Sequence, residues 1–247
     1  MGLISFSEEK VFVQNSQREE NVIMIYLYSG TPGSGKSYDA AELICKKYKQ
    51  GKNIFCNFEI DEEYLKKKYP KSKAHVFCID NRDLKYPFGL TGFSNNFHHR
   101  DKSGRVPEKQ SYLFIDECNN NFDSRTWNEK GRAEWNHWFS EHRKDGFQVI
   151  LITQSVDDID KKIRKRIEIE VQHFNVTNFK VFGKLLAMLF GGNLFIRRSQ
   201  WFTKGKNKAN KISSGFAVGH KKYFRVFNTS KRFAKAVDSD PVWRVLG

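Results

Sequence analysis

The sequence predicts an α/β fold, in which a mainly parallel sheet is flanked by helices and followed by a small, basic, antiparallel β-rich appendage. Three observations lead to this prediction. Short apolar runs alternate with helical patterns through the first two thirds of the chain, as in a parallel sheet with helices on both faces. A glycine-rich turn joins the first of these runs to the first helical pattern. The last third contains shorter, aromatic, alternating runs within a strongly basic block.

Length and composition set the domain organisation that we expect. A chain of 247 residues is long enough for one α/β domain with a small appendage. We expect residues 1–21 to be a polar N-terminal extension, residues 22–168 to form the core, and residues 169–247 to form the basic appendage. Hydrophobic residues make up 39% of the chain and charged residues 29%, which fits a globular protein better than a disordered or membrane-spanning one.

The core elements follow from apolar periodicity. Strands are expected at Val22–Tyr28, Asn53–Phe58, Ala74–Ile79, Tyr112–Ile115 and Phe147–Thr153. Helical patterns are expected at Ser37–Tyr48, Asp61–Tyr69 and Arg132–Arg143, with an amphipathic segment at Val156–Ile167. The stretch Asp80–Ser111 is rich in Gly, Pro, Asn and His and is expected to be a long surface loop or a flexible insertion. The appendage strands are expected at Ile169–Phe174, Phe179–Phe182, Leu194–Phe202 and Tyr223–Phe227.

The glycine-rich turn has the sequence GTPGSGKS, which fits the phosphate-binding P-loop pattern G-x-x-x-x-G-K-S/T. Its glycines allow successive backbone N–H groups to point into one concavity that fits a polyphosphate. Lys36 would bring positive charge to the β and γ phosphates, and the Ser37 hydroxyl could ligate Mg²⁺. The sequence therefore predicts an ATP site, with Mg²⁺, formed by Gly30, Thr31, Pro32, Gly33, Ser34, Gly35, Lys36 and Ser37.

Polar side chains at the ends of two later strands complete this candidate site. The run Tyr112–Ile115 ends in Asp116 and Glu117, two adjacent carboxylates at the sheet edge. We expect Asp116 to hold the Mg²⁺ shell and Glu117 to orient and polarise the attacking water. Gln154 follows the strand Phe147–Thr153, and its neutral amide is expected to sense the γ-phosphate or position the water.

Arginines beyond that strand are candidates for a residue supplied across a subunit interface. Arg164 and Arg166 form a positive cluster with no evident acidic partner among these motifs, and Arg143 is a second candidate. A guanidinium can neutralise transition-state charge from a neighbouring subunit. Surface charge on a basic helix is the alternative interpretation.

Charge and cysteine usage indicate the surroundings. The formal net charge is +15, and Val171–Val237 contains fourteen Lys and Arg but no Asp or Glu. This block indicates an anionic partner, either nucleic acid or an anionic membrane surface, with a solvated basic face as the alternative. The uncharged run Leu185–Ile196 is too short to cross a bilayer and is expected to be a buried segment or a membrane-surface insertion. The four cysteines have no CxxC pair or zinc spacing, so we expect buried thiols in a reducing compartment.

On these residues the chain resembles the zonular occludens toxin family, which includes the filamentous phage assembly ATPases of the gene I product type. The similar segments are MIYLYSGTPGSGKS from Met24, YLFIDE from Tyr112, HRKDGFQVILITQ from His142, IDKKIRKRIE from Ile159 and YFRVFNT from Tyr223. The resemblance implies a Mg²⁺-dependent ATPase akin to the FtsK and HerA translocases, in a homo-oligomeric ring with a hexamer favoured.

The same resemblance implies a biological role and partners. It points to extrusion of single-stranded DNA phage through the host inner membrane, from the cytoplasmic face of that membrane. The implied partners are the phage DNA, coat proteins, other assembly or export proteins and the anionic membrane surface. Family members commonly begin near the residue matching Met24 and carry a later membrane span, so we expect residues 1–23 to be an extension or a misassigned start, and the chain to be a cytoplasmic fragment or to anchor differently.

Other functions remain open from the residues alone. A cytosolic DNA translocase or helicase would share the core and use the basic block to grip DNA, with salt-sensitive binding of single strands. A small-molecule kinase would share the phosphate-binding loop but has no evident use for the basic block. A nucleotide switch without catalysis is disfavoured by Glu117.

Overall fold

The structure is a computed structural model that describes residues 25–81, 84, 90–92, 94, 101–126, 128, 130–178, 194–202, 210–227 and 244–245. Its helices are α2 (Lys36–Lys49), α3 (Glu62–Lys68), α5 (Cys118–Asn121), α6 (Arg132–Glu141), α7 (Lys161–Arg164), the 3₁₀ helix η1 (Val176–Asn178) and α9 (Lys221–Phe224). Its strands are β1 (Ile25–Ser29), β2 (Asn53–Cys56), β3 (Val76–Cys78), β4 (Ser111–Ile115), β5 (Phe147–Thr153), β6 (Ile167–Asn175), β7 (Leu194–Trp201), β8 (Lys211–Val218) and β9 (Arg244–Val245).

All of these strands belong to one mixed sheet in the order β8-β7-β6-β1-β5-β4-β2-β3-β9. The six strands from β6 to β3 in this order are parallel to their neighbours. Antiparallel pairing attaches β7 and β8 at one edge and β9 at the other. The α/β fold with a mainly parallel sheet and antiparallel C-terminal strands is confirmed.

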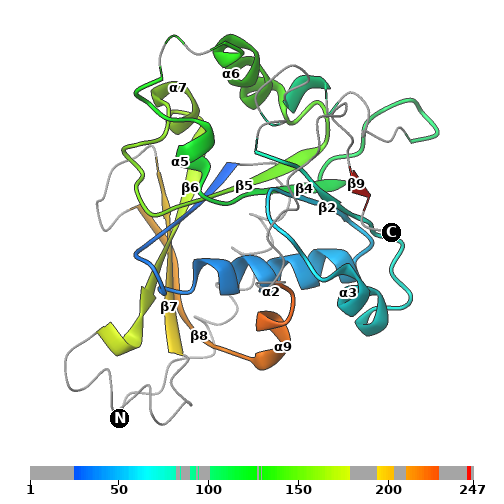
Figure 1. Cartoon of the computed structure of the whole chain (residues 1–247), viewed down its shortest axis with the longest axis vertical. Coiled ribbons are helices and arrows are strands. Elements are labelled where there is room, and N and C mark those ends of the chain that lie inside the picture. The colour runs from blue at the N-terminus through cyan, green and yellow to red at the C-terminus, as the bar shows by residue number, and fades with distance from the viewer. Residues whose placement is uncertain are drawn as a thin grey trace.

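Helices cover both faces of the sheet (Figure 1). The face under α2, α3 and α9 contains a core that includes Ile44, Leu65 and Val226. The opposite face, under α5, α6 and α7, contains a second core that includes Trp135 and Ile163. Because both faces are covered, the central strands are apolar throughout, and every residue of β4 and β5 is buried.

The structure corrects the expected position of Ile169–Phe174. This segment lies in β6, which pairs in parallel with β1 and antiparallel with β7. It is therefore part of the central sheet and not the first strand of an antiparallel unit. Burial explains the placement, because Ile169, Glu170, Val171 and His173 are all buried between the two neighbouring strands and the covering elements. Whether residues 169–247 form a domain of their own stays a prediction.

The C-terminal strands differ from the expectation in two further ways. The run expected as a strand at Tyr223–Phe227 lies mostly in α9 and the turn after it, and Phe227 alone makes an isolated bridge to Ile60. The helical turn places Tyr223 and Val226 on the same side, against the core under α2. The strand β8 was not expected, because two serines and Gly215 interrupt its apolar pattern.

Some expectations fall outside the described residues. These are the N-terminal extension, the strand at Phe179–Phe182, and most of the uncharged run Leu185–Ile196. Only the last three residues of that run are described, at the start of β7. Within the described part of the chain, no helix is both long and apolar enough to span a bilayer.

Candidate active site

The parallel strands bring the predicted site residues to one edge of the sheet. The strands β1, β5, β4 and β2 are neighbours in this order and run in the same direction. Their carboxyl ends therefore lie side by side (Figure 1). The residues that follow these ends are Gly30–Ser37 after β1, Gln154 after β5, Asp116 and Glu117 after β4, and Asn57 after β2.

The P-loop needs its glycines for both backbone angles and space. Gly30, Gly33 and Gly35 have φ values of 141°, 70° and 102°, which favour glycine. A Cβ on Gly30 would lie 2.5 Å from the carbonyl oxygen of His173, and one on Gly35 would lie 2.7 Å from the ring of Phe195. The loop is therefore packed directly onto β6 and β7, and Gly35 forms the N-cap of α2.

Lys36 lies inside this loop. Its Nζ donates to the carbonyl oxygens of Gly30 at 2.6 Å and Thr31 at 3.0 Å. Burial lowers the pKa of Lys36, while the negative charges of Asp116 and Glu117 act in the opposite direction. Lys36 and the two carboxylates follow the carboxyl ends of β1 and β4, which both pair in parallel with β5, so they lie at the same end of the sheet.

The other loop residues are divided between solvent and interior. Thr31, Pro32 and Ser37 are exposed at the mouth of the loop, so the Ser37 hydroxyl is open to a ligand. The Ser34 hydroxyl is fully buried and has no hydrogen-bond partner among the described residues. A buried polar group without a partner is costly, which suits a site that is completed by a ligand.

The two carboxylates at the end of β4 differ in their surroundings. Burial raises the pKa of Asp116, and the neighbouring Glu117 carboxylate adds to this rise. An oxygen of Asp116 accepts the backbone N–H of Glu117 at 2.9 Å. Glu117 has the left-handed backbone φ of 48°, which is uncommon for a residue with a side chain. Its Oε1 accepts from Gln154 Nε2 at 2.9 Å, so two of the predicted residues are in direct contact.

Asn57 holds Asp116 in place and was not predicted. Its Oδ1 accepts the backbone N–H of Asp116 at 2.7 Å, and its Nδ2 donates to the backbone carbonyl of Asp116 at 2.9 Å. The same amide group donates to Asn81 Oδ1 at 2.7 Å, which also accepts from Asn121 at 3.0 Å. Asn57 follows β2 at the carboxyl end of a parallel strand, so its position was the signal that could have identified it.

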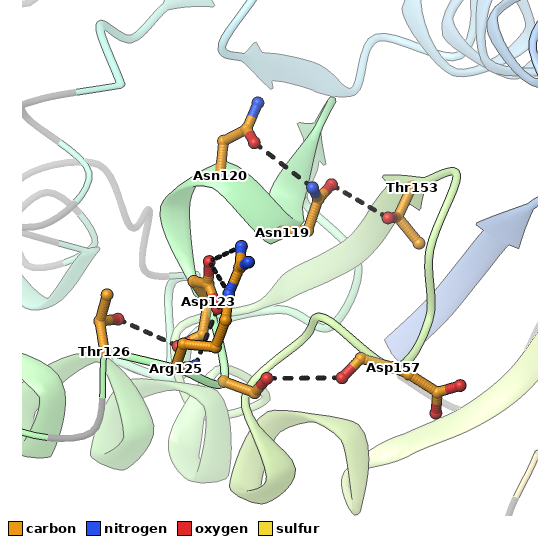
Figure 2. A network of polar contacts seen from close by, with 8 residues as sticks. Asn119, Asn120, Asp123, Arg125, Thr126, Thr153 and Asp157 are labelled. Atoms are coloured by element: carbon orange, nitrogen blue, oxygen red, sulfur yellow. Dashed lines mark hydrogen bonds and ion pairs between the residues drawn. The ribbon is translucent and has the colours of Figure 1, made fainter.

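The short helix after Glu117 is fixed to the end of β5 (Figure 2). Thr153 Oγ1 donates to Asn119 Oδ1 at 3.0 Å. In the turn that follows α5, Arg125 forms an ion pair with Asp123. The Thr153–Asn119 bond holds α5 next to the end of β5, directly before Gln154, and so helps to keep Glu117 and Gln154 in contact.

The arginine candidates lie elsewhere and have partners. Arg164 Nη1 is 2.7 Å from Asp157 Oδ1, an acidic partner outside the predicted motifs that the turn before α7 brings close. Arg166 Nη1 donates to the carbonyl oxygen of Lys162 at 2.9 Å, and Arg143 pairs with Glu168. Arg166 directly precedes β6, whose first residue pairs with the first residue of β1, so it lies near the amino ends of the parallel strands. The P-loop follows the carboxyl end of β1, about 16 Å away along that strand.

Donors for a metal ion are few. No group of three or more His, Cys, Asp or Glu side chains that could hold a metal is present in the described part of the chain. Mg²⁺ is commonly held by one or two carboxylates with phosphate oxygens and water, so the pair Asp116 and Ser37 fits Mg²⁺ bound together with a nucleotide. The four cysteines are free and buried, as expected.

Comparison with known proteins gives consistent matches. The family model described as Zonular occludens toxin (Zot) matches residues 24–188. The Gene 1 protein of Enterobacteria phage I2-2 is 26% identical over 175 residues, which cover 69% of this chain and 46% of that protein. The Zona occludens toxin of Vibrio cholerae is 25% identical over 166 residues, which cover 61% of this chain and 40% of that protein. The chain thus spans less than half the length of these relatives.

A solved structure also resembles this fold. The crystal structure of the N-terminal domain of zonular occludens toxin from Neisseria meningitidis aligns with a TM-score of 0.50 and 15% identity. The alignment covers 83% of this chain and 98% of that one. At this identity the likeness concerns the fold alone.

Proposed function

The chain belongs to the zonular occludens toxin (Zot) family, and from this membership we propose that it hydrolyses ATP to drive assembly and extrusion of a filamentous single-stranded DNA phage through the host inner membrane. The curated relatives include gene 1 proteins of filamentous phages, which supports the phage role. The observation that carries the proposed hydrolysis is the contact of Gln154 with Glu117 beside the P-loop lysine, at one sheet edge.

The P-loop residues would bind the polyphosphate. The backbone N–H groups from Gly33 to Ser37 and the N-terminus of α2 would receive the phosphates. Lys36 would exchange its bonds with the loop carbonyls for the β and γ phosphates. Asp116 and Ser37 would hold Mg²⁺, which supplies charge neutralisation at the phosphates when bound.

Glu117 is the proposed general base. Its carboxylate would orient the water that attacks the γ-phosphate and accept a proton from it. Gln154 donates to Glu117 Oε1, so it would fix the direction of the carboxylate, whose other oxygen would face the water. Asn57 would fix the backbone position of Asp116, and with it that of Glu117, because its side chain bonds both the N–H and the carbonyl of Asp116.

A substitution pair tests this assignment. Lys36→Ala should lose ATP affinity in calorimetry, whereas Lys49→Ala, an exposed lysine of the same helix, should not. Glu117→Gln should bind ATP normally and hydrolyse it at least a hundredfold more slowly, because an amide cannot accept the proton. Glu134→Gln, an exposed glutamate of α6, is the matched control. Wild-type turnover in Glu117→Gln would remove Glu117 from the mechanism.

We further propose that hydrolysis needs a ring, with Arg164 or Arg166 supplied by the neighbouring subunit. Support comes from the position of Arg166 near the amino ends of the parallel strands, from which it cannot reach the P-loop of its own chain. An Arg164→Ala, Arg166→Ala double variant mixed with Glu117→Gln should regain activity at mixed interfaces. If the mixture stays inactive although both variants assemble and bind ATP, the arginine does not act in trans.

The partners proposed for the basic strands are the phage single-stranded DNA, coat or export proteins and the anionic inner-membrane surface, with the protein at the cytoplasmic face. The alternative is a cytosolic DNA translocase. ATP turnover measured with single-stranded DNA, with anionic liposomes and with neither separates these roles. Stimulation by liposomes supports the membrane role, and stimulation by DNA alone favours the translocase.

A further inference from the structure

A buried charged cluster lies directly behind the P-loop and has no part in the chemistry described above. Asp39 is in the first turn of α2, and its side chain is 9% exposed. One of its carboxylate oxygens lies 2.9 Å from His173 Nε2 on β6, and the other lies 2.5 Å from Arg197 Nη1 on β7. Arg197 also reaches Glu42 at 3.1 Å, one helical turn further along α2.

The hydrogen bonds of His173 connect β6 to two other elements. Its Nε2 faces the Asp39 carboxylate, and its Nδ1 faces the backbone carbonyl of Ser29 at 3.2 Å. Both partners accept hydrogen bonds, so the His173 ring is held between an acceptor on α2 and an acceptor at the end of β1. The cluster thus places the Arg197 guanidinium and the His173 ring against two carboxylates, Asp39 and Glu42.

The position of Asp39 makes this pairing important for the nucleotide. The N-terminus of α2 is the end that receives the phosphates, and Asp39 lies within about one turn, or about 5 Å of helix, from it. An uncompensated carboxylate there would repel a polyphosphate through an interior that screens charge weakly. The Arg197 guanidinium and the His173 ring each lie within hydrogen-bond distance of one Asp39 oxygen and so provide that compensation.

We propose that His173 and Arg197 are positioning residues for nucleotide binding, because their contacts compensate the Asp39 carboxylate and fix β6 and β7 to the P-loop helix. This rests on the proposed ATP site. The strand β6 also supports the loop at two other points. The Gly30 backbone packs on the His173 carbonyl, and Asn175 Nδ2 donates to the Gly33 carbonyl at 3.0 Å. ATP affinity therefore depends on residues that never touch ATP.

The test separates charge from packing by measuring ATP and ADP affinities by calorimetry. Arg197→Gln should weaken ATP binding about tenfold and ADP binding less, because ADP carries less charge. Arg198→Gln removes the same charge from the adjacent position of β7 and should change both affinities less than twofold. Adding Asp39→Asn to Arg197→Gln should restore ATP affinity to within about threefold of wild type.

Two controls keep the outcome decisive. Asp39→Asn alone should bind ATP at least as tightly as wild type, although it also disrupts the Asp39–Arg197 ion pair. If Asp39→Asn and the double variant bind ATP as weakly as Arg197→Gln, the cluster acts through packing and the inference is overturned. If Arg197→Gln does not fold, Asp39→Asn alone decides between charge and packing, because weaker ATP binding by Asp39→Asn would also overturn the inference. Absence of ATP binding by the wild type would instead refute the proposed function.

Discussion

Replacing Asn57 with alanine tests how the sheet edge holds its carboxylates. The Asn57 side chain is buried and makes both of its Asp116 contacts with the backbone, one as acceptor and one as donor. The substitution leaves the Asp116 side chain chemically unchanged. It leaves one backbone N–H and one carbonyl, both in a half-buried position, without their protein partners.

The size of the effect follows from these two groups. A buried polar group that loses its partner costs about 1–3 kcal/mol, and water entering the vacated space recovers part of this. We therefore expect Asn57→Ala to lower the free energy of unfolding by about 2–3 kcal/mol in urea titrations. A domain of ordinary stability, about 5–15 kcal/mol, remains folded after such a loss.

Activity should fall by more than stability implies. Because Asp116 and Glu117 are no longer held, we expect kcat to fall at least tenfold, while ATP affinity stays within about threefold because the P-loop is untouched. Asn120→Ala is the control, because it removes an exposed amide whose side-chain bond within the described part of the chain is to Asn119 at 3.3 Å. Unchanged kcat in folded Asn57→Ala would refute the idea that this amide positions the carboxylates.

Three further outcomes follow from the structure. Burial lowers the pKa of His142 to about 4, so as the pH falls the unfolded chain binds a proton at this residue before the folded chain does. Urea titrations should therefore show about 2 kcal/mol less stability at pH 5 than at pH 7, and His142→Gln should remove that loss. Gly35→Ala should lower the melting temperature and abolish ATP binding because its Cβ meets the Phe195 ring, whereas Gly33→Ala, with nothing within 4 Å, should be milder. Burial also lowers the pKa of Lys36, so ATP affinity measured against pH should decline on the alkaline side earlier than for an ordinary lysine, and Lys36→Arg should flatten that profile.

Local sequence signals were enough to predict which candidate residues lie at the carboxyl ends of the central strands. The P-loop pattern, the strand ending in Asp116 and Glu117, and the strand ending in Gln154 each need only neighbouring residues to be recognised. Parallel pairing then had to bring these ends together, and the alternation of strands and helices implied that pairing. The contact between Glu117 and Gln154 is a consequence of two correctly placed strand ends.

Long-range contacts could not be predicted in this way. Asp39 and Arg197 are separated by 158 positions in the chain, and nothing near either residue indicates the other. The sequence around His173 predicts only an ordinary position in an alternating strand, because the role of this residue depends on which strand lies beside β1. The α9 helix was predicted as a strand because an aromatic run of five residues fits both structures until its packing partner is known.

The central position of β1 also has a consequence for how the chain folds as it is made. The strand carrying the P-loop pairs only with β5 and β6 among the described residues, and those strands begin at Phe147 and Ile167. At about 5–20 residues per second, the ribosome would need on the order of ten seconds to deliver them after β1 emerges. During that interval β1 has two open edges, a state that favours aggregation. Fragments that end before β6 should therefore be difficult to obtain as folded protein, and expression at a lower temperature or with a chaperone should increase the yield of the longer chain.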